Sequence, residues 1–365
     1  MQFKKIGGEQ KLNINLEELG WNSWFEKEYH ENNPEGVPCR IVEQHKNSYI
    51  VQNETGVFKA KLSGKMVYEG EFAAVGDWVS VTGGESDEFR IVEYIYSRKS
   101  KISRKVAGKK SVEQIIASNI DYLFIVISLN DDFNLRRAER YLTAAYESGA
   151  EPVIVLSKSD VCEERDEKIG KIRKIAKDVD VICTTVFEKD GLKELECYLE
   201  KGSTAALVGS SGVGKSSIIN RLIGKEVMKT GSIREDDSKG RHTTTSRELI
   251  HLENGANIID TPGMRELQLW DAEEGIEILF EDIAELEKMC RFKDCTHSGE
   301  PGCAVSEAVL SGQIDKKRYE SYLKLKKEAY FMEERKEKSL ARIEKDKWKK
   351  IGMFQKEIYK STGKK

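Results

Sequence analysis

The stretch ALVGSSGVGKSSIIN begins at Ala206 and contains the pattern G-x-x-x-x-G-K-[ST]. The residues of this glycine-rich turn are Gly209, Ser210, Ser211, Gly212, Val213, Gly214, Lys215, Ser216 and Ser217. An apolar stretch precedes the turn and a helix-forming stretch follows it, as the pattern requires. The backbone N–H groups of such a turn can surround a phosphate, and the helix N-terminus adds positive potential. We expect Lys215 to reach the β- and γ-phosphates of a bound nucleotide and Ser216 to bind Mg²⁺.

A second set of polar residues can complete the metal site and sense the γ-phosphate. The sequence DTPG, which starts at Asp260, ends an apolar stretch downstream of the turn. Asp260 can hold the metal through water, and the N–H of Gly263 can meet the γ-phosphate. Three consecutive threonines precede DTPG within a polar, glycine-containing segment. Of these three, Thr243 or Thr244 is our choice to complete the metal shell.

The base-reading loop is predicted from VIVLSKSD, where Ser157, Lys158, Ser159 and Asp160 follow an apolar strand. This resembles the N-K-x-D motif, whose carboxylate accepts hydrogen bonds from N1–H and the amino group of guanine. Such a charge-assisted bond contributes about 1.5–3 kcal/mol. Ser157 replaces the usual Asn, and its shorter side chain is expected to lose a contact with the base or with the phosphate loop. We therefore expect weaker nucleotide binding with guanine preference retained. Alternatively, Asp160 only caps the next helix. The stretch CTTV, from Cys183, stands at the second base loop but matches the usual S-A-K poorly.

The order of these motifs along the chain is unusual. The base-reading loop comes first, then the phosphate loop, the threonines and DTPG, and no second N-K-x-D candidate follows Gly263. From Ile115 onward, strand-like and helix-like stretches alternate, which predicts a parallel sheet covered on both faces. The simplest interpretation is a GTPase domain whose chain order is circularly permuted. Permutation is tolerated where the original termini lie close together on the surface.

GTP hydrolysis also requires a group that orients the attacking water. The residue after DTPG is Met264, which cannot orient water as a glutamine does. His242, just before the threonines, is the best catalytic candidate within the chain. The alternative is an ordinary loop histidine. Partner-assisted GTPases gain on the order of 10³–10⁵ in rate, so a partner could supply the missing assistance.

A cluster of metal-ligating residues follows the last predicted strand. The stretch CRFKDCTHSGEPGC contains Cys290, Cys295, His297 and Cys303. Three cysteines and one histidine form a common structural zinc set that leaves no open position for catalysis. The alternative is a group of buried or redox-active cysteines. The other four cysteines are scattered and are expected to be core residues or free thiols.

Basic residues gather in two places in a chain of net charge −3. From Gln313 to Lys365 there are 18 Lys and Arg against 9 Asp and Glu. The stretch SRKSKISRKVAGKK, from Ser97, has seven basic residues and no acidic one. Such clusters favour polyanions, and RNA is the expected partner. The alternative is a solvated helix face and a flexible linker.

The N-terminal part of the chain predicts a small β-barrel. After a polar segment with a short aromatic helix, four or five alternating strands fall within about 65 residues, which suggests an oligonucleotide-binding (OB) barrel. An SH3-like barrel is the second choice. No apolar run approaches the roughly 20 residues of a membrane helix, and the first ten residues lack a signal-peptide core. We therefore expect a cytoplasmic protein without membrane contact.

The complete pattern resembles the ribosome small-subunit-dependent GTPase A family of bacterial circularly permuted GTPases. The resemblance extends from about Leu19 to the C-terminal helix. It rests on the barrel, S-K-x-D, the phosphate loop, GRHTTT, DTPG and C-x₄-C-x-H-x₅-C. It implies a multidomain protein: an N-terminal segment (1–35), an OB-fold barrel (36–105), a permuted α/β P-loop GTPase domain (106–275) and a mainly α zinc-binding domain with a basic C-terminal helix (276–365).

The resemblance also implies a function. A member of this family binds the 30S ribosomal subunit, contacts 16S ribosomal RNA and acts late in 30S maturation. It hydrolyses GTP to GDP and phosphate with ribosome stimulation, as a monomer with one structural Zn²⁺ and with Mg²⁺ bound to GTP. By this analogy His242 is the catalytic histidine, and residues 157–160 and 209–217 contact GTP. Two other functions stay open: an RNA-binding module with a structural nucleotide, and a phosphoryl-transfer kinase.

Overall fold

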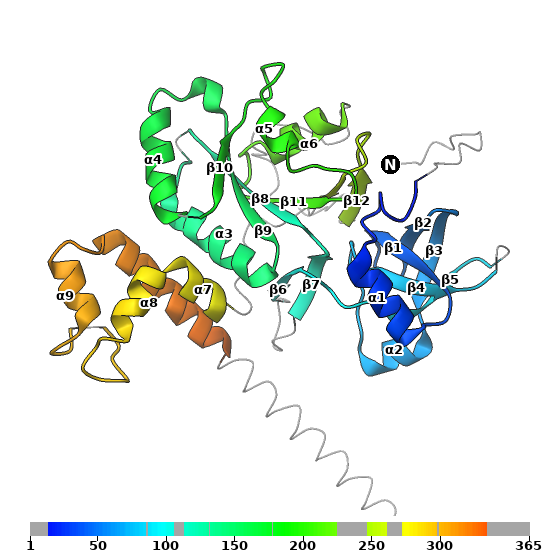
Figure 1. Cartoon of the computed structure of the whole chain (residues 1–365), viewed down its shortest axis with the longest axis horizontal. Helices are drawn as coiled ribbons and strands as arrows, with labels where there is room; N and C mark the ends of the chain where they lie inside the picture. The colour runs from blue at the N-terminus through cyan, green and yellow to red at the C-terminus, as the bar shows by residue number, and fades with distance from the viewer. Residues whose placement is uncertain are drawn as a thin grey trace, which may run out of the picture. The chain divides into compact units, whose positions relative to one another are not determined.

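The structure is a computed structural model of the whole chain (Figure 1). It describes residues 14–84, 87–105, 113–130, 132–176, 178–224, 247–260, 272–297 and 299–333. The chain divides into two compact units. The first comprises residues 1–103 and 115–267, and the second comprises 104–114 and 268–365. The first unit holds both the barrel and the α/β sheet.

The barrel is a closed five-stranded sheet. Its strands are β1 (Val37–Gln44), β2 (Tyr49–Asn53), β3 (Gly56–Leu62), β4 (Trp78–Thr82) and β5 (Arg90–Ile95). The hydrogen-bonded order is β1-β2-β3-β5-β4, and a β1–β4 pairing closes the ring. β3 and β5 are parallel, and α2 (Gly64–Glu69) connects β3 to β4. This arrangement confirms the predicted OB barrel.

The aromatic helix predicted before the barrel is α1 (Ser23–Asn32). The side chain of Asn22 caps its N-terminus by accepting a hydrogen bond from the N–H of Trp24. Phe25 is fully buried and packs with Trp21 against Trp78 of β4. The helix therefore covers one side of the barrel with its aromatic residues.

The second part of the first unit is an α/β sheet. Its strands are β8 (Tyr122–Ser128), β9 (Glu151–Ser157), β10 (Asp180–Cys183), β11 (Thr204–Val208), β12 (Arg247–His251) and β13 (Asn257–Asp260). The order is β10-β9-β8-β11-β13-β12, with all neighbours parallel except the β12–β13 pair. The predicted parallel sheet is thus confirmed, with one antiparallel strand at its end.

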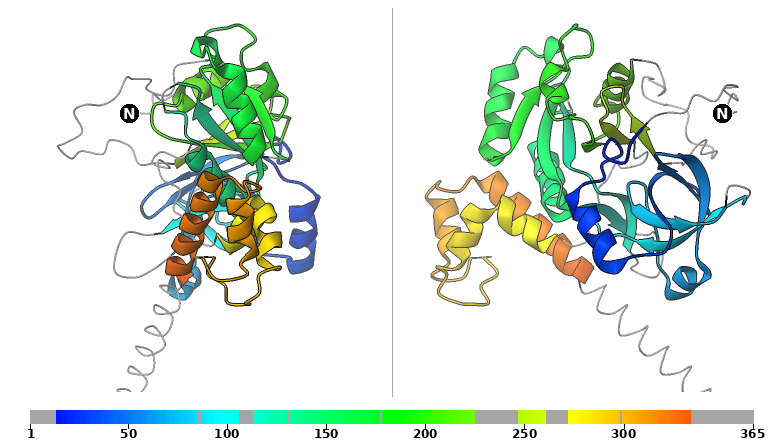
Figure 2. Two further views of the ribbon diagram at one scale, coloured as in Figure 1. Left: turned by 90° about the vertical axis from the view of Figure 1, so that its left-hand side faces the viewer. Right: turned by 45° about the vertical axis from the view of Figure 1, so that its right-hand side comes forward.

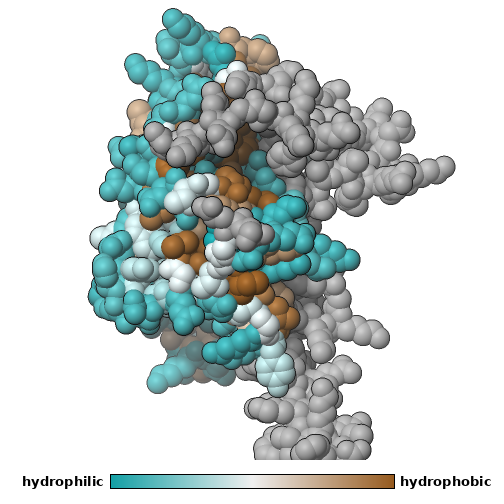
Figure 3. All heavy atoms as spheres, turned by 90° about the vertical axis from the view of Figure 1, so that its right-hand side faces the viewer, coloured by the Kyte–Doolittle hydropathy of each residue, from teal (hydrophilic) through white to brown (hydrophobic). Residues whose placement is uncertain are grey.

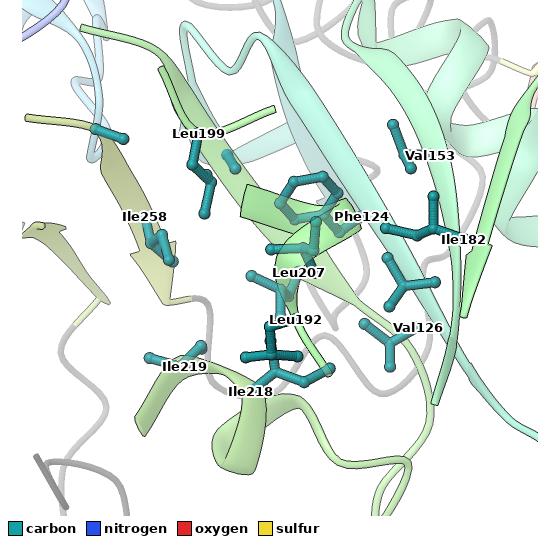
Figure 4. Close-up of a cluster of buried hydrophobic side chains, with 14 of the residues drawn as sticks. Phe124, Val126, Val153, Ile182, Leu192, Leu199, Leu207, Ile218, Ile219 and Ile258 are labelled. Atoms are coloured by element: carbon teal, nitrogen blue, oxygen red, sulfur yellow. The ribbon is translucent and has the colours of Figure 1, made fainter. Parts of the chain in front are cut away.

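Helices cover both faces of this sheet (Figures 1 and 2). They are α3 (Leu135–Ser148), the 3₁₀ turn η1 (Ser159–Val161), α4 (Arg165–Ile175), α5 (Lys193–Glu196) and α6 (Lys215–Ile223). Leu192 and Leu195 around α5, together with Ile218 of α6, pack on Phe124 and Leu207 of the sheet (Figure 4). α3 and α4 lie on the opposite face. Burial on both faces explains why the central strands read as continuous apolar runs.

The barrel and the α/β sheet share hydrogen-bonded strands. β1 pairs antiparallel with β12, so that Glu43 lies opposite Glu248 and Gln44 opposite Arg247. A side-chain bond of 2.8 Å from Nη1 of Arg247 to Oε1 of Gln44 reinforces the pairing. The result is one sheet of eleven strands. The sequence did not predict this junction, because the paired residues lie about two hundred positions apart.

Two buried charged side chains, Arg40 and Asp77, stabilise the junction between the barrel and the α/β sheet. Arg40 is 1% exposed and donates hydrogen bonds to backbone carbonyls of Leu19, Gly76 and Asn119. These carbonyls belong to the N-terminal segment, the barrel and the chain entering β8. One guanidinium thus satisfies backbone groups from three stretches of the chain.

Asp77 is the acidic counterpart and is fully buried. Arg98 donates to both of its carboxylate oxygens at 2.6 Å. The hydroxyl of Ser118 donates to Oδ1 at 2.5 Å, and the N–H of Ala74 donates to Oδ2 at 2.8 Å. A buried carboxylate is stable only when it is paired and hydrogen-bonded in this way.

The second unit is mainly helical in its described residues. It contains α7 (Glu273–Leu279), α8 (Glu281–Glu287), α9 (Ala304–Leu310) and a further helix over residues 316–333. Arg318 of the last helix forms two hydrogen bonds with the carboxylate of Asp282. A separate two-stranded sheet pairs β6 (Lys101–Lys105) with β7 (Glu113–Ser118). β6 falls in the basic stretch, for which no strand was predicted, and β7 lies after that stretch.

The described surface is mixed in polarity. On the face drawn in Figure 3, hydrophilic residues surround several separate hydrophobic patches. Among the apolar side chains of the barrel, Tyr68 and Phe72 are 92% and 67% exposed. Single exposed apolar side chains are common on protein surfaces. Within the described ranges, no helix has the length and apolar character needed to cross a membrane.

Replacing Asp77 with Ala should destabilise the first unit strongly. The change leaves Arg98 without its buried partner, and breaking a buried ion pair costs about 3 kcal/mol or more. The free energy of unfolding can be measured by urea titration. Glu31→Gln is the matched control, because it removes an exposed ion pair with Lys27 worth about 0.5 kcal/mol or less. Equal losses in both variants would contradict a structural role for Asp77.

Candidate functional site

The predicted phosphate loop connects the C-terminal end of β11 to α6. Gly209, Gly212 and Gly214 have φ values of 147°, 78° and 103°, which favour glycine. A Cβ atom on Gly209 would collide with the backbone carbonyl of Val126. Nζ of Lys215 lies 2.6 Å from the carbonyl oxygens of Gly209 and Ser210, so its ammonium group lies over the loop. The strand, loop and helix predicted for this segment are therefore present.

The structure brings the predicted base-reading loop against the phosphate loop. Oγ of Ser157 donates to the carbonyl of Val213 at 2.6 Å, and Nζ of Lys158 donates to the carbonyl of Gly212 at 2.9 Å. Ser157 is 4% exposed, whereas Asp160 is exposed. We expected the shorter serine side chain to lose a contact with the base or with the phosphate loop. The contact with the phosphate loop is retained.

The second base loop also joins this site. The carbonyl of Thr184 accepts hydrogen bonds from both the N–H and the hydroxyl of Ser159, at 3.3 and 3.1 Å. Thr184 is 1% exposed, and its N–H donates to the carbonyl of Leu156 in β9. The sequence CTTV matched the usual motif poorly, so this residue was not selected. Its role depends on backbone groups, which leave little trace in a sequence pattern.

Asp260 lies at the C-terminal end of β13, beside the strand that carries the phosphate loop. Burial raises the pKa of its carboxyl group to about 6, and the positive charge of Lys215 partly opposes this rise. The carboxylate and the loop lysine therefore interact electrostatically. This is the position at which an acidic group can act on a metal held at the phosphate loop.

The remaining predicted residues lie outside the described residues. They are His242, Thr243, Thr244 and Gly263. Of the predicted magnesium set, Ser216 at the start of α6 and Asp260 at the end of β13 are described. The described residues thus include the predicted base loops, the predicted phosphate loop and one acidic group of the predicted magnesium set.

Tyr141 is a contact of the phosphate loop that the sequence analysis missed. It lies on α3 and is 2% exposed. Burial raises the pKa of its phenol, and a hydrogen bond with Ser210 of the phosphate loop opposes the rise. In the sequence, Tyr141 is one apolar position of an amphipathic helix, so nothing distinguishes it from a core residue.

In the second unit, the four predicted metal ligands converge. The potential ligand atoms of Cys290, Cys295, His297 and Cys303 all lie within 4.8 Å of one another. Nδ1 of His297 is 3.6 Å from Sγ of Cys290 and 3.5 Å from Sγ of Cys303, and these two sulfurs are 3.9 Å apart. Tetrahedral zinc would separate its ligands by roughly 3.5 Å for nitrogen–sulfur and 3.8 Å for sulfur–sulfur pairs. The cluster is compatible with a structural metal ion.

The electrostatics of the cluster also suit a cation. Burial alone would raise the pKa of Cys303, but hydrogen bonds from Ser306 and His297 lower it to about 6. The thiolate is the form of cysteine that binds metals. Nε2 of His297 faces a carboxylate, Glu287, at 2.6 Å, so Nδ1 is left for a metal.

An α/β sheet with the predicted base loops after β9 and β10 and the predicted phosphate loop after the later strand β11 has the order of a circularly permuted P-loop GTPase. The family model for the RsgA GTPase matches residues 95–270. The small ribosomal subunit biogenesis GTPase RsgA of Methanosarcina acetivorans is 44% identical over 94% of each chain. RsgA 1 of Oceanobacillus iheyensis is 42% identical over 94% of this chain and 99% of its own. The chain belongs to the RsgA GTPase family and is a GTP-hydrolysing enzyme.

Solved structures agree with this assignment. YjeQ from Thermotoga maritima has 28% sequence identity and a TM-score of 0.60, and the match covers 80% of this chain and 98% of that chain. YloQ, described as a circularly permuted GTPase, has 25% identity and a TM-score of 0.58, over 80% of this chain and 94% of its own. The permuted order predicted from the sequence is therefore confirmed.

Replacing Ser157 with Ala should weaken the binding of both GTP and GDP. The change removes the bond to Val213 and leaves a buried carbonyl without this donor, which costs about 1–2 kcal/mol, or roughly 5- to 30-fold in Kd. Binding can be measured by titration with fluorescent nucleotides.

Ser128→Ala is the matched control for Ser157→Ala. Ser128 is buried on β8 directly opposite Ser157, and its hydroxyl has no hydrogen-bond partner among the described residues. Its removal should leave the Kd unchanged. If both variants bind nucleotide as tightly as the natural protein, Ser157 does not hold the two loops together.

The stability of the protein free of nucleotide and metal should depend on Asp260. Its pKa of about 6 exceeds the ordinary 3.8, so the folded chain binds more protons than the unfolded chain between these pH values. This group therefore lowers the free energy of unfolding as the pH rises through that window, and the penalty persists above pH 6. Asp260→Asn should flatten the slope and be more stable than the natural protein above pH 6.

Thermal unfolding from pH 4 to 8 with a chelator tests this expectation. Asp190→Asn, at an exposed loop position, is the control and should keep the natural slope. Parallel curves for Asp260→Asn and the natural protein would show that the carboxyl group is not held in an unfavourable environment.

Proposed function

We propose that this chain binds the 30S ribosomal subunit and acts late in its maturation, hydrolysing GTP to GDP and phosphate with stimulation by the ribosome. One observation carries the nucleotide part: the hydroxyl of Ser157 bonds to Val213, which joins the base-reading and phosphate loops at one site. The ribosomal part draws on relatives named small ribosomal subunit biogenesis GTPases, 40–45% identical to this chain. Their length is similar, so the comparison involves whole chains.

Within the site, each group has a proposed role. Residues 157–160 hold the guanine base, and the carboxylate of Asp160 accepts from its N1–H and amino group. Residues 209–217 surround the phosphates with backbone N–H groups, and Lys215 neutralises the β- and γ-phosphates. Its present bonds to two loop carbonyls would be exchanged for bonds to phosphate oxygens.

Mg²⁺ accompanies the nucleotide in this proposal. Ser216 would bind the ion directly, and Asp260 would hold it through water, together with Thr243 or Thr244. When bound, the ion neutralises charge that develops on the phosphates. The N–H of Gly263 would sense the γ-phosphate. Binding of a cation near Asp260 would favour its ionised form over the protonated one.

His242 is our candidate for orienting the attacking water. Met264 cannot do so, because a thioether neither donates a hydrogen bond nor accepts one strongly. A group of the ribosome could complete the arrangement, and partner assistance of about 10³–10⁵ in rate corresponds to about 4–7 kcal/mol of barrier. Ribosome stimulation would follow directly from such sharing.

The Cys₃His cluster would bind one Zn²⁺ in a structural role. Four protein ligands fill a tetrahedral shell, so the metal would stabilise the fold instead of taking part in hydrolysis. Lys61 of β3, with its ammonium 3.6 Å from the ring centroid of Phe89, is a basic and aromatic feature of the barrel suited to RNA. We assign 16S ribosomal RNA as the polyanion for the barrel and the basic tail, and a monomer in the cytoplasm as the working state.

The proposal keeps the domain limits given by the sequence: 1–35, 36–105, 106–275 and 276–365. The absence of a glutamine directly after DTPG favours a second function. In it, the chain is an RNA-binding module and the nucleotide has a structural role. The two functions differ in whether turnover responds to the ribosome.

GTP hydrolysis should therefore be measured with and without purified 30S subunits. Stimulated turnover should exceed intrinsic turnover by orders of magnitude, and His242→Ala should lower it with the GTP affinity nearly unchanged. Association should weaken steeply with salt, because phosphate contacts release counterions. His251→Ala is the control. His251 ends β12 and bonds to Asn257 at the start of β13, which is the opposite end of that strand from Asp260. Turnover that ignores 30S subunits would favour the structural-nucleotide alternative.

A further inference from the structure

His297 is the one histidine of the metal cluster, and its two ring nitrogens face different partners. Nδ1 faces the sulfurs of Cys290 and Cys303, at 3.6 and 3.5 Å. Nε2 lies 2.6 Å from Oε1 of Glu287, the last residue of α8. Since an ionised carboxylate only accepts hydrogen bonds, Nε2 carries the proton and Nδ1 keeps its lone pair for the metal. A carboxylate in this place orients the ring and increases its basicity.

The same oxygen of Glu287 receives two more hydrogen bonds. The hydroxyl of Tyr322 donates at 2.5 Å, and Nζ of Lys326 donates at 2.7 Å. Both residues lie four positions apart on the helix over residues 316–333, so they share one face of it. Three donors therefore meet at one carboxylate oxygen, one from the metal cluster and two from this helix.

Further contacts join the same helix to the metal loop. The hydroxyl of Tyr319 donates to the backbone carbonyl of His297, and that carbonyl also accepts from the hydroxyl of Ser306. The backbone of His297 has a φ of 59°, a conformation rare for residues other than glycine. Such a conformation persists only where the surroundings impose it. The hydrogen bonds to its carbonyl are part of those surroundings.

We propose that Glu287 is a positioning residue that couples the metal site to the helix over residues 316–333. It holds His297 in the tautomer that binds metal, and it anchors the helix through Tyr322 and Lys326. Metal binding fixes the ring, the ring fixes the carboxylate, and the carboxylate fixes the helix. Because linkage is reciprocal, a docked helix also strengthens metal binding. This inference rests on the proposed Zn²⁺ at the Cys₃His cluster.

The first test compares Glu287→Gln with Glu285→Gln in the full-length protein. Glu285 lies on the same helix, α8, and is exposed, so it is a matched control. Zinc transfer to a chromophoric chelator should become about 10- to 100-fold more favourable in Glu287→Gln, as for other residues that support metal ligands. It should stay at the natural level in Glu285→Gln. Equal zinc retention in both variants would overturn the proposal.

The second test works from the helix side and leaves the metal ligands and Glu287 unchanged. Tyr322→Phe removes one hydroxyl and keeps the ring that packs on Phe280. We expect a several-fold faster loss of zinc. In the natural protein, chelation of the metal should increase protease cleavage within residues 316–333 before the first unit unfolds. Unchanged zinc loss in Tyr322→Phe, or unchanged cleavage after chelation, would contradict the coupling.

Elemental analysis of the natural protein separates this inference from the zinc proposal. One zinc per chain with no effect of Glu287→Gln would leave the zinc site in place and refute the coupling alone. A natural protein that neither retains nor binds zinc would refute both. Cobalt substitution adds a spectroscopic check, since a histidine that no longer binds through Nδ1 changes the ligand field of the ion.

Discussion

The predicted nucleotide site depends on the parallel pairing of the central strands of the α/β sheet. β8, β9, β10, β11 and β13 run in the same direction, so their C-terminal ends meet on one side of the sheet. Loops that leave this edge are neighbours whatever their order along the chain. That is why a permuted chain can assemble the same site. The bond from Ser157 to Val213 joins residues 56 positions apart and is a direct product of this arrangement.

Features encoded by short stretches could be predicted from the sequence. The glycine-rich turn requires positive φ angles, which glycine adopts readily. The four metal ligands fall within fourteen residues. Both features were therefore found from residue spacing. The barrel followed from alternating strands and was confirmed in detail. The retained contact of Ser157 was missed, because a hydroxyl that reaches a distant carbonyl has no sequence signature. The role of Tyr141 was hidden for the same reason, since its helical position is that of any core residue.

The junction between barrel and sheet was also beyond the reach of pattern analysis. It depends on Arg40 and Asp77, two charged residues that composition would place on the surface. Both are buried because each satisfies backbone groups or polar side chains from several stretches. The second unit has a similar arrangement, in which one oxygen of Glu287 contacts both a predicted metal ligand and the helix over residues 316–333. In both places, a charged side chain joins segments that are distant in sequence.

The pairing of β1 with β12 has a consequence for how other molecules can approach the sheet. An unpaired edge strand exposes backbone groups that invite strand addition, either by a partner or by another copy of the chain. β12 would be such an edge, and it directly follows the segment that carries the predicted switch threonines. In the structure, β1 of the barrel pairs with the first two residues of β12, Arg247 and Glu248. In the described residues the α/β sheet retains a free edge only at β10, which is four residues long. A partner strand therefore cannot add to β12 at its start, which is the end that follows the predicted switch threonines.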